Sequence, residues 1–389
     1  MITDLSDQHL RFRDRVRTYM VEQMMTADFE AELKDPLWSH GGGPIYWQKL
    51  EQLGRDGWIK MSWPKELGGE GADPIEQYIL VEESKRVGFP WPALSANSIG
   101  PMVARYAQGE VREKVVGEIL SGSAYLAIGY SEPGAGSDLA NLRTRAVRDG
   151  DDWVINGQKI WTSCAPFSQY IWLAARTDPD PAKRHKGITI FLVPTNTPGY
   201  SCTTIHTLGV DTAATYYQDV RVPDSYRVGE LNGGWSLITA QLNLERLALV
   251  NYGYVAMLYD HTLNLLKTHE DFKHLLQLPW VQRNLALAKV KLEGLKMMCL
   301  KALWVMNNGG SGMVEASSTK VYGSQVYVEL GRLMGEIIGS QGLLREGSDV
   351  IVSGLMEKLY RKGSVLTFGG GANEIQRNII AQAGLKLPR

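Results

Sequence analysis

The chain has 389 residues, of which 44% are hydrophobic and 21% charged, and its formal net charge is -1. This length and composition are typical of a globular protein with two or three domains. A near-neutral charge without blocks of like charge argues against nucleic acid or an anionic membrane as the main partner. Charges interrupt every apolar run before the ~20 residues of a membrane span, and the N-terminus lacks a signal-peptide core. We therefore expect a cytoplasmic protein.

Cysteine and histidine usage gives no sign of a disulfide framework or a metal site. Cys164, Cys202 and Cys299 are odd in number and far apart, which favours reduced thiols. The seven histidines are scattered, and neither HExxH nor CxxC occurs. No bound metal is expected.

The first 123 residues have helical periodicity. Apolar spacing predicts helices near 10–20, 45–57, 76–87 and 110–122. Asp73 and Pro74 are expected to begin the third of these helices, as its cap and first-turn residue. The sequence therefore predicts an N-terminal helical domain over 1–123.

Between residues 124 and 231 the period of the apolar residues changes to two. Short runs rich in β-branched and aromatic residues predict strands at 125–131, 142–148, 152–156, 159–163, 170–176, 187–193 and 215–222. These strands do not alternate with helices, and the GxGxxG fingerprint of a Rossmann domain is absent. A small sheet domain of barrel or sandwich type is predicted here.

Two local features are expected within this sheet. The dipeptide Asn156-Gly157 is the strongest short hairpin signal and should join two strands. On the strand that follows, alternation would place Trp161 and Ser163 on one face. Ile160 and Thr162 would then lie on the other face. An indole beside a hydroxyl suits a flat polar ring.

After residue 232 the sequence returns to long helices. They are predicted near 235–267, 276–307, 319–338 and 350–361, with a last helix from after Asn373 to about Gly384. Four long helices of this kind form a bundle over 232–389. The fold class is therefore α+β, with an N-terminal helical domain, a small middle β-sheet domain and a C-terminal four-helix bundle.

Two segments resemble those of a known family. YSEPGAGSD at 130–138 and NGQKIWTS at 156–163 resemble the signature segments of the acyl-CoA dehydrogenase flavoproteins, in the family's order and spacing. The helix, sheet, helix order is similar too, so the resemblance covers essentially the whole chain. It implies an FAD-dependent oxidoreductase that removes an α-proton and a β-hydride from an acyl-CoA, giving a trans-2-enoyl-CoA.

The resemblance also implies which residues bind FAD. The strand and its serine would contact the flavin ring, while Gly136 and Ser137 would meet the pyrophosphate, because glycine lets backbone N–H groups approach an anion closely. Trp161 would cover the ring, and Ser163 would bond near N5, where the hydride arrives. The predicted cofactor contacts are Tyr130, Ser131, Gly136, Ser137, Trp161, Thr162 and Ser163.

The base is expected on a helix. Many family members carry a glutamate before a Gly-Thr pair near the C-terminus, but here Gly370 stands at that position, in TFGGGANEIQR. Gly370 cannot take a proton, although its backbone N–H can bond the thioester oxygen; a flexible linker is the alternative. Other members, which act on branched or bulky chains, place the base on the first long C-terminal helix. The segment LNLERLAL there offers Glu245.

Helical spacing places Glu245 inside an apolar stripe formed by Ile238, Leu242, Leu249, Tyr252 and Ala256. Burial would raise its pKa toward the working range of a base. The alternative is an ion pair between Glu245 and the adjacent Arg246. The predicted catalytic residues are thus Glu245 and Gly370, and the predicted substrate contacts are Arg246, Gly370 and Gly371.

The sequence departs from the family at two positions that, in family members, contact the FAD of a neighbouring subunit. An arginine and a glutamine that reach a neighbour's FAD are replaced by Thr268, or a residue beside it, and by Glu336. A glutamate there would repel phosphate. The pattern resembles the catalytic subunit of heterotetrameric steroid side-chain dehydrogenases, with one FAD per heterodimer. We therefore expect a hetero-oligomer with a second acyl-CoA dehydrogenase-like subunit, and otherwise a homotetramer.

The expected reaction belongs to fatty acid or steroid catabolism. The base on a helix and the side-chain-free GGG segment fit a bulky, branched or sterol side-chain acyl group, and the expected electron acceptor is an electron-transfer flavoprotein. The alternatives are a non-catalytic partner subunit, an acyl-CoA oxidase and a flavin monooxygenase on the same fold.

Overall fold

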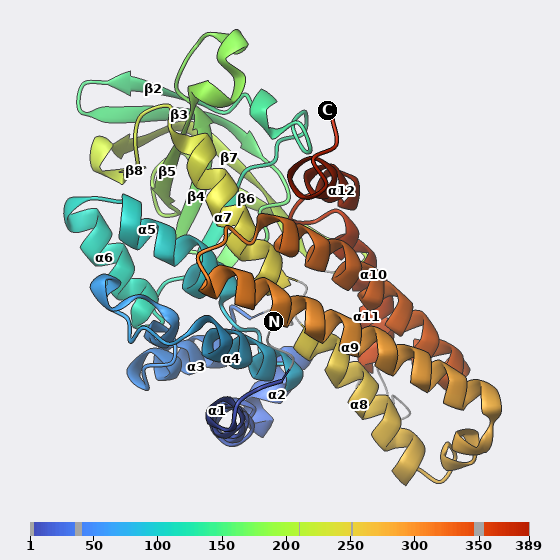
Figure 1. Cartoon of the computed structure of the whole chain (residues 1–389). Coiled ribbons are helices and arrows are strands. Elements are labelled where there is room, and N and C mark those ends of the chain that lie inside the picture. Colours follow the sequence, from blue (N-terminus) through green and yellow to red (C-terminus); the bar gives the residue numbers. More distant parts are fainter. Residues whose placement is uncertain (1–3, 36–40, 210, 250–251, 346–353, 389) are drawn as a thin grey trace. The chain divides into compact units, whose positions relative to one another are not determined.

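A computed structural model describes residues 4–35, 41–209, 211–249, 252–345 and 354–388. The chain forms two compact units. Unit 1 comprises Met1–Thr26, Asp73–Trp91 and Arg246–Arg389; unit 2 comprises Ala27–Ala72 and Pro92–Glu245. The predicted fold class is confirmed, since helices at both ends of the chain flank one mixed sheet in the sequence (Figure 1). The predicted boundaries at 123 and 231 stay predictions.

Unit 2 begins with helices. They are α2 (Ala27–Lys34), α3 (Pro44–Arg55), the π-helical turn η4 (Leu94–Ile99), α5 (Gly100–Tyr106) and α6 (Gly109–Leu120). The predicted helices at 45–57 and 110–122 correspond to α3 and α6. The pair η4 and α5 was missed because Gly100 and Pro101 interrupt the apolar pattern there.

The sheet of unit 2 has eight strands in the order β6-β7-β3-β2-β4-β5-β8, with β1 paired in parallel to β4. The strands are β1 (Leu126–Gly129), β2 (Arg145–Asp149), β3 (Asp152–Lys159), β4 (Tyr170–Arg176), β5 (Ile188–Pro194), β6 (Tyr200–Ile205), β7 (Thr212–Pro223) and β8 (Arg227–Val228). Trp153, Ile155, Ile171, Phe191 and Tyr217 belong to its buried core. The sequence did not predict β6 and β8, which are half-exposed or short.

The predicted hairpin at Asn156-Gly157 is wrong. Both residues lie inside β3, where its register with β7 shifts. The Asn156 side chain exchanges two hydrogen bonds with Asp219, at 2.9 and 3.0 Å, so tertiary pairing across a bulge overrides the local turn signal. Gly157 is needed because a Cβ there would lie 2.5 Å from Thr144 Oγ1. The turn between β2 and β3 is at Gly150, where φ is 62°.

The predicted strand at 159–163 is also wrong beyond its first residue. β3 ends at Lys159, and Trp161 has a left-handed backbone with φ of 63°. The predicted division of side chains still holds in terms of burial. Trp161 and Ser163 are exposed, whereas Thr162 is fully buried and Ile160 is half-buried.

Unit 1 is helical. Its N-terminal part contains α1 (Asp7–Tyr19), the π-helical turn η1 (Met20–Met24) and α4 (Pro74–Arg86). Its C-terminal part contains α8 (Tyr252–Thr268), α9 (Pro279–Asn307), α10 (Met313–Ile338), α11 (Leu355–Gly363), α12 (Asn373–Ile379) and the turn η13 (Ile380–Gly384). α8, α9, α10 and α11 contribute to one hydrophobic core. No helix in the described ranges is long and apolar enough to cross a membrane.

The observed ends of these helices can be compared with the ends predicted from the sequence. Asp73 caps α4 as predicted, since its Oδ1 accepts the N–H groups of Ile75 and Glu76 at 2.7 and 2.8 Å. α10 begins at Met313 rather than near Thr319, because Gly312 supplies the left-handed cap before it. The predicted helix at 235–267 corresponds to α7 (Gly234–Leu249) and α8; residues 250–251 lie outside the described ranges.

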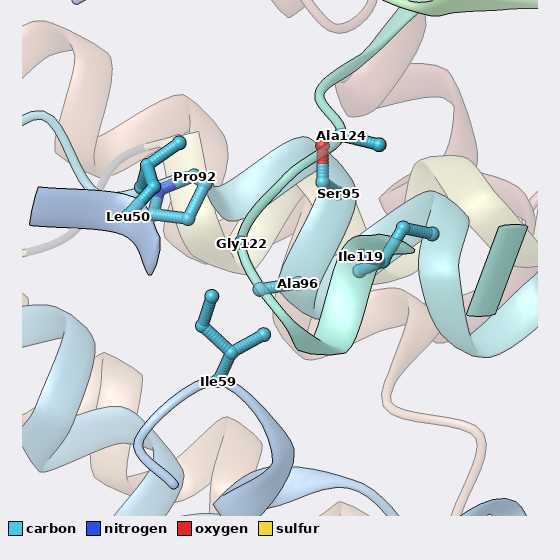
Figure 2. Close-up of a pocket in the computed structure, with 8 residues that line it drawn as sticks. All are labelled: Leu50, Ile59, Pro92, Ser95, Ala96, Ile119, Gly122 and Ala124. Atoms are coloured by element: carbon cyan, nitrogen blue, oxygen red, sulfur yellow. The ribbon is translucent and has the colours of Figure 1, made fainter. Parts of the chain in front are cut away.

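A packing junction in unit 2 holds the start of β1. Leu50 of α3, Ile119 of α6 and Ser95 of η4 meet around a narrow gap (Figure 2), which has no volume for a water molecule. Ser95 Oγ accepts the backbone N–H of Leu126 at 2.9 Å. The junction therefore anchors the strand that leads into the SEPGAGSD segment.

One ion pair fastens α1 to α4 in unit 1. Arg17 donates two 2.8 Å hydrogen bonds to Glu83, whose side chain is only 1% exposed. Arg17→Met would leave that carboxylate buried without this partner. Because the Arg17 side chain is itself 43% exposed, the free energy of unfolding is expected to fall by about 1–3 kcal/mol.

Urea denaturation followed by circular dichroism measures the effect. Arg221→Met removes a half-exposed arginine from the exposed pair with Asp149 and is the control, with an expected loss of about 0–1 kcal/mol. Equal losses in the two variants would contradict the burial argument. The double replacement Arg17→Met with Glu83→Leu should recover much of the loss.

Candidate active site

A buried ion pair joins the two signature segments. Lys159, at the end of β3, is fully buried, and its Nζ donates to Glu132 Oε1 at 2.8 Å and to the Tyr130 carbonyl at 3.0 Å. Glu132 also accepts the backbone N–H groups of Arg143 and Thr144, at 2.6 and 2.8 Å. Two other stretches of chain, at Lys159 and at 143–144, are thus fastened to the carboxylate of Glu132.

The surroundings keep this pair ionised. Burial raises the pKa of Glu132, but the charge and hydrogen bond of Lys159 and the two backbone donors outweigh it and hold the pKa below its ordinary value. Burial lowers the pKa of Lys159 to about 8, against the opposing effect of Glu132. Near neutral pH the lysine is therefore still charged.

The SEPGAGSD loop presents its glycine and serine to the outside. Glu132 and Ala135 exchange backbone hydrogen bonds of 2.9 and 3.1 Å, which closes a tight turn with Ala135 buried. Gly136 and Ser137 are exposed, and a Cβ added at Gly136 would meet nothing within 4 Å. Such an open backbone fits the approach of a pyrophosphate.

The residues after β3 fit a flat ring. The Trp161 side chain is 58% exposed although its backbone is held in a left-handed conformation. Ser163 is exposed and lies 3.1 Å from Thr212, Oγ to Oγ1. Thr162 points into the sheet domain and lies 3.5 Å from Thr215, so it can offer a ligand only its backbone. The Ser131 carbonyl accepts the N–H of Ile160, which brings the two segments together.

Together these features of unit 2 fit a flavin dinucleotide: an exposed indole for one ring face, a hydroxyl near it and an open glycine loop for the phosphates.

A chain of hydrogen bonds connects Tyr130 to Glu245. The Tyr130 hydroxyl accepts from Trp172 Nε1 at 2.8 Å and donates to Gln241 Oε1 at 3.0 Å. Gln241 Nε2 then donates to Ser98 Oγ at 2.7 Å and to Glu245 Oε2 at 2.8 Å. Burial raises the pKa of Tyr130 well above its ordinary value, so the phenol keeps its proton.

Glu245 is half-buried on α7, and of its predicted stripe Ile238 is fully buried and Leu242 half-buried. The side chains of Arg246 and Leu249 lie outside the described residues, so the predicted substrate contact of Arg246 stays a prediction, as does its ion pair with Glu245. The structure thus brings Glu245 together with Tyr130, through Gln241, within unit 2.

The glycine run of unit 1 is a held turn rather than a loose linker. Gly370 and Gly371 have φ of 67° and 99°, which other residues rarely adopt. Lys320 of α10 is fully buried, and its Nζ donates to the carbonyls of Thr367 and Gly371, at 3.1 and 2.6 Å, and to Asn373 Oδ1 at 2.9 Å. One lysine therefore fixes both ends of the turn.

Thr268 and Glu336, the two positions that depart from the family, make hydrogen bonds to other residues of unit 1. Glu336 accepts hydrogen bonds from Arg332 at 2.6 Å and from Asn284 at 3.0 Å. Thr268 ends α8 and donates to the Asn264 carbonyl at 2.9 Å.

A cavity of about 60 Å³, with room for water, lies in unit 1 between α1, α4 and α9. Arg17, Glu82 and Lys296 are among its lining residues, and it contains none of the predicted site residues. No group of three or more metal-ligating side chains occurs in the described ranges.

Sequence reasoning missed Gln241, Ser98 and Lys320. Gln241 lies three residues after Ile238 and four before Glu245, so the helical spacing that selected Glu245 could have found it. Nothing in the sequence marks Ser98, whose role depends on a contact between residues 143 positions apart.

The Glu132–Lys159 pair makes stability depend on acidity. Because the folded pKa of Glu132 lies below its ordinary 4.5, its stabilising contribution is present above pH 4.5 and is lost as the pH falls below that value. Glu132→Gln is expected to be about 3–5 kcal/mol less stable than the wild type near pH 7, since it leaves Lys159 buried without its partner. This difference should shrink at lower pH.

Urea unfolding of both proteins between pH 7 and about pH 3, a range that includes the window below pH 4.5, tests this. Glu110→Gln, which changes an exposed carboxyl on α6, should stay within about 0.5 kcal/mol of the wild type. A difference between Glu132→Gln and the wild type that is small at pH 7 and grows with acidity would overturn the assignment.

Models of a known protein family match the chain along most of its length. The N-terminal, middle and C-terminal domain models of acyl-CoA dehydrogenases match residues 6–123, 127–220 and 232–385. Acyl-CoA dehydrogenase FadE26 of Mycobacterium tuberculosis is 42% identical, over 98% of each chain.

Two solved structures are similar over all of both chains. A Tcur3481–Tcur3483 steroid acyl-CoA dehydrogenase has 40% identity and a TM-score of 0.93, and the ChsE4–ChsE5 complex from Mycobacterium tuberculosis has 41% identity and a TM-score of 0.90. Proteins of this family are generally FAD-dependent oxidoreductases. With all three domain models matched and a relative this similar along its whole length, the chain belongs to the acyl-CoA dehydrogenase family.

Proposed function

We propose that this acyl-CoA dehydrogenase is the catalytic subunit of a hetero-oligomer that converts a bulky, branched or sterol side-chain acyl-CoA to its trans-2-enoyl-CoA, with Glu245 as the base. The main support is that the Glu245 carboxylate is hydrogen-bonded to Gln241 and, through it, to Tyr130 beside the flavin segment. A carboxylate held next to the predicted ring contacts can act where the α-proton leaves.

Different residues of the chain remove the α-proton, stabilise the thioester oxygen and hold the cofactor. The α-hydrogen of a thioester is a weak acid, so its removal needs a base and a donor that stabilises charge on the carbonyl oxygen. Glu245 accepts the proton, and the backbone N–H of Gly370, beside Gly371, donates to the oxygen. When bound, FAD supplies the acceptor for the β-hydride. Tyr130, Ser131, Gly136, Ser137, Trp161, Thr162 and Ser163 are the residues that would hold it.

The turn at Gly370 supports a wide pocket. A glycine offers a backbone N–H without a side chain. Lys320 of α10 holds the turn in place through its hydrogen bonds to Gly371 and Asn373. A bulky acyl group therefore meets no side chain at this position. The steroid dehydrogenases among the similar structures agree with such a substrate.

We also propose an electron-transfer flavoprotein as the electron acceptor, by the family resemblance, and a cytoplasmic location. Cys164, Cys202 and Cys299 form no disulfide, which suits a reducing compartment.

Glu245→Gln should retain FAD and lose dehydrogenation by about 100-fold or more, because general base catalysis contributes about 10²–10⁴-fold to the rate. Anaerobic bleaching of the flavin by a panel of branched and sterol acyl-CoAs is the measurement. Glu230→Gln, an exposed carboxyl before α7, is the control.

Turnover of Glu245→Gln close to that of the wild type would refute the base. Wild-type enzyme that no acyl-CoA bleaches would instead point to a flavin monooxygenase, and oxygen consumption during turnover would indicate an acyl-CoA oxidase.

The proposed partner subunit supplies what Thr268 and Glu336 lack. Expressed alone, the chain should bind well below one FAD per subunit, whereas co-expression with the partner should give one FAD per heterodimer. Restoring the family residues by Thr268→Arg with Glu336→Gln should raise the FAD content of the chain expressed alone, because it replaces a repulsive carboxylate near phosphate by donors.

Flavin absorbance per chain measures the FAD content, and light scattering measures the oligomeric state. A stable homotetramer of the unaltered chain with one FAD per subunit would refute the partner. Thr268→Ser, which keeps the hydroxyl, is the control substitution.

A further inference from the structure

We propose that Gln241 is a positioning residue for the Glu245 carboxylate, and that a buried tryptophan fixes the direction of the hydrogen bonds that orient it. The inference rests on the proposed role of Glu245 and adds the residues that place it. Gln241 and Trp172 are both fully buried.

The direction of the chain of hydrogen bonds follows from its first donor. An indole N–H can only donate, so the Tyr130 oxygen must accept from Trp172 at 2.8 Å. The remaining bond of Tyr130, at 3.0 Å to Gln241, is then made by the phenol proton. The opposite amide atom faces the Glu245 carboxylate, which can only accept, so that atom is Nε2 and the atom facing Tyr130 is the carbonyl oxygen Oε1.

The other end of the amide is thereby turned toward Glu245. Its two N–H groups are used at 2.7 Å on Ser98 Oγ and 2.8 Å on Glu245 Oε2. The Ser98 hydroxyl lies 3.4 Å from the backbone carbonyl of Gln241 and donates to it, so its lone pair faces the amide. Rotating the Gln241 side-chain amide by 180° would place its oxygen against the Glu245 carboxylate. It would also break the hydrogen bonds of the amide to Tyr130, Ser98 and Glu245.

The same residues tie the base to the flavin segment. Tyr130 directly follows β1, and Gln241 and Glu245 are one turn apart on α7. The π-helical turn η4 contacts both elements, because Ser95 accepts from Leu126 of β1 and Ser98 accepts from Gln241. π-Helical turns within helices are often found at functional sites. Strand, turn and helix therefore hold the carboxylate at a fixed place beside the predicted ring contacts.

Gln241→Leu tests the proposal in the FAD-loaded enzyme with its partner subunit. Leucine has a similar volume but cannot donate to Glu245. Because misplacing a catalytic group by about 1 Å costs up to about 100-fold, we expect kcat to fall about 10- to 100-fold, with KM changed less than about threefold. FAD content and the melting temperature of the variant are measured alongside.

A second readout does not depend on turnover. A 3-thiaacyl-CoA offers an α-proton but no β-hydride, so its exchange with deuterated solvent reports proton removal by Glu245. Exchange should slow by the same factor as kcat in Gln241→Leu. Gln169→Leu is the matched control, since Gln169 also makes two hydrogen bonds, to Tyr125 and Phe167, outside this network.

Tyr130→Phe tests the direction of the network without touching Glu245. Removal of the phenol hydroxyl takes away the donor to Oε1 and leaves Ser98 alone to hold the amide, so exchange should again slow while KM is retained. This variant replaces Gln241→Leu if the latter does not fold. Exchange and kcat within twofold of the wild type in a folded variant, with Glu245→Gln inactive, would overturn the positioning role alone. Unimpaired exchange in Glu245→Gln would overturn the proposed function instead.

Discussion

The buried pair between Lys159 and Glu132 is the contact on which the two predicted flavin-binding segments depend. Lysine reaches the carbonyl of Tyr130 and the carboxylate of Glu132 at once, and the same carboxylate receives two backbone N–H groups. The two glycines of the SEPGAGSD loop give its backbone extra conformational freedom, so contacts from outside the loop help to define its conformation. A charge that is buried and fully bonded imposes it strongly, because any other conformation leaves that charge unpaired.

A second network, of neutral side chains, runs from Tyr130, whose carbonyl Lys159 bonds, to the helix that carries Glu245. Here neutral donors and acceptors are the better choice, since a cation beside the proposed base would compete for its proton. Gln241 can hold a carboxylate without neutralising it, and Tyr130 and Trp172 bury apolar rings while contributing one polar atom each. The two networks thus divide the work: the ion pair fixes the loop, and the neutral chain fixes the carboxylate.

Local signals predicted what depends on local physics. The cap at Asp73, most helices and six of the strand regions follow from side-chain periodicity and capping, and these are present. The prediction at Asn156-Gly157 failed because the asparagine side chain bonds Asp219 of β7, a paired strand that is distant in sequence, and because a bulge can have the same sequence as a turn. Gln241 could have been selected by its helical spacing from Glu245. Ser98 and Lys320 could not, because their partners are brought to them only by the fold.

The turn that contains Gly370 is held in one conformation by a buried lysine. A turn made of three glycines would sample many conformations, and only an anchor makes it a defined donor of N–H groups. Lys320 is such an anchor, since it is fully buried and bonds two carbonyls and one amide oxygen around the turn. Keeping a buried lysine there costs desolvation, and that cost is unnecessary for a linker. Its presence is consistent with the proposal that the backbone of this turn, rather than any side chain on it, is the functional group. Under that proposal the proton is removed by a residue elsewhere, such as Glu245.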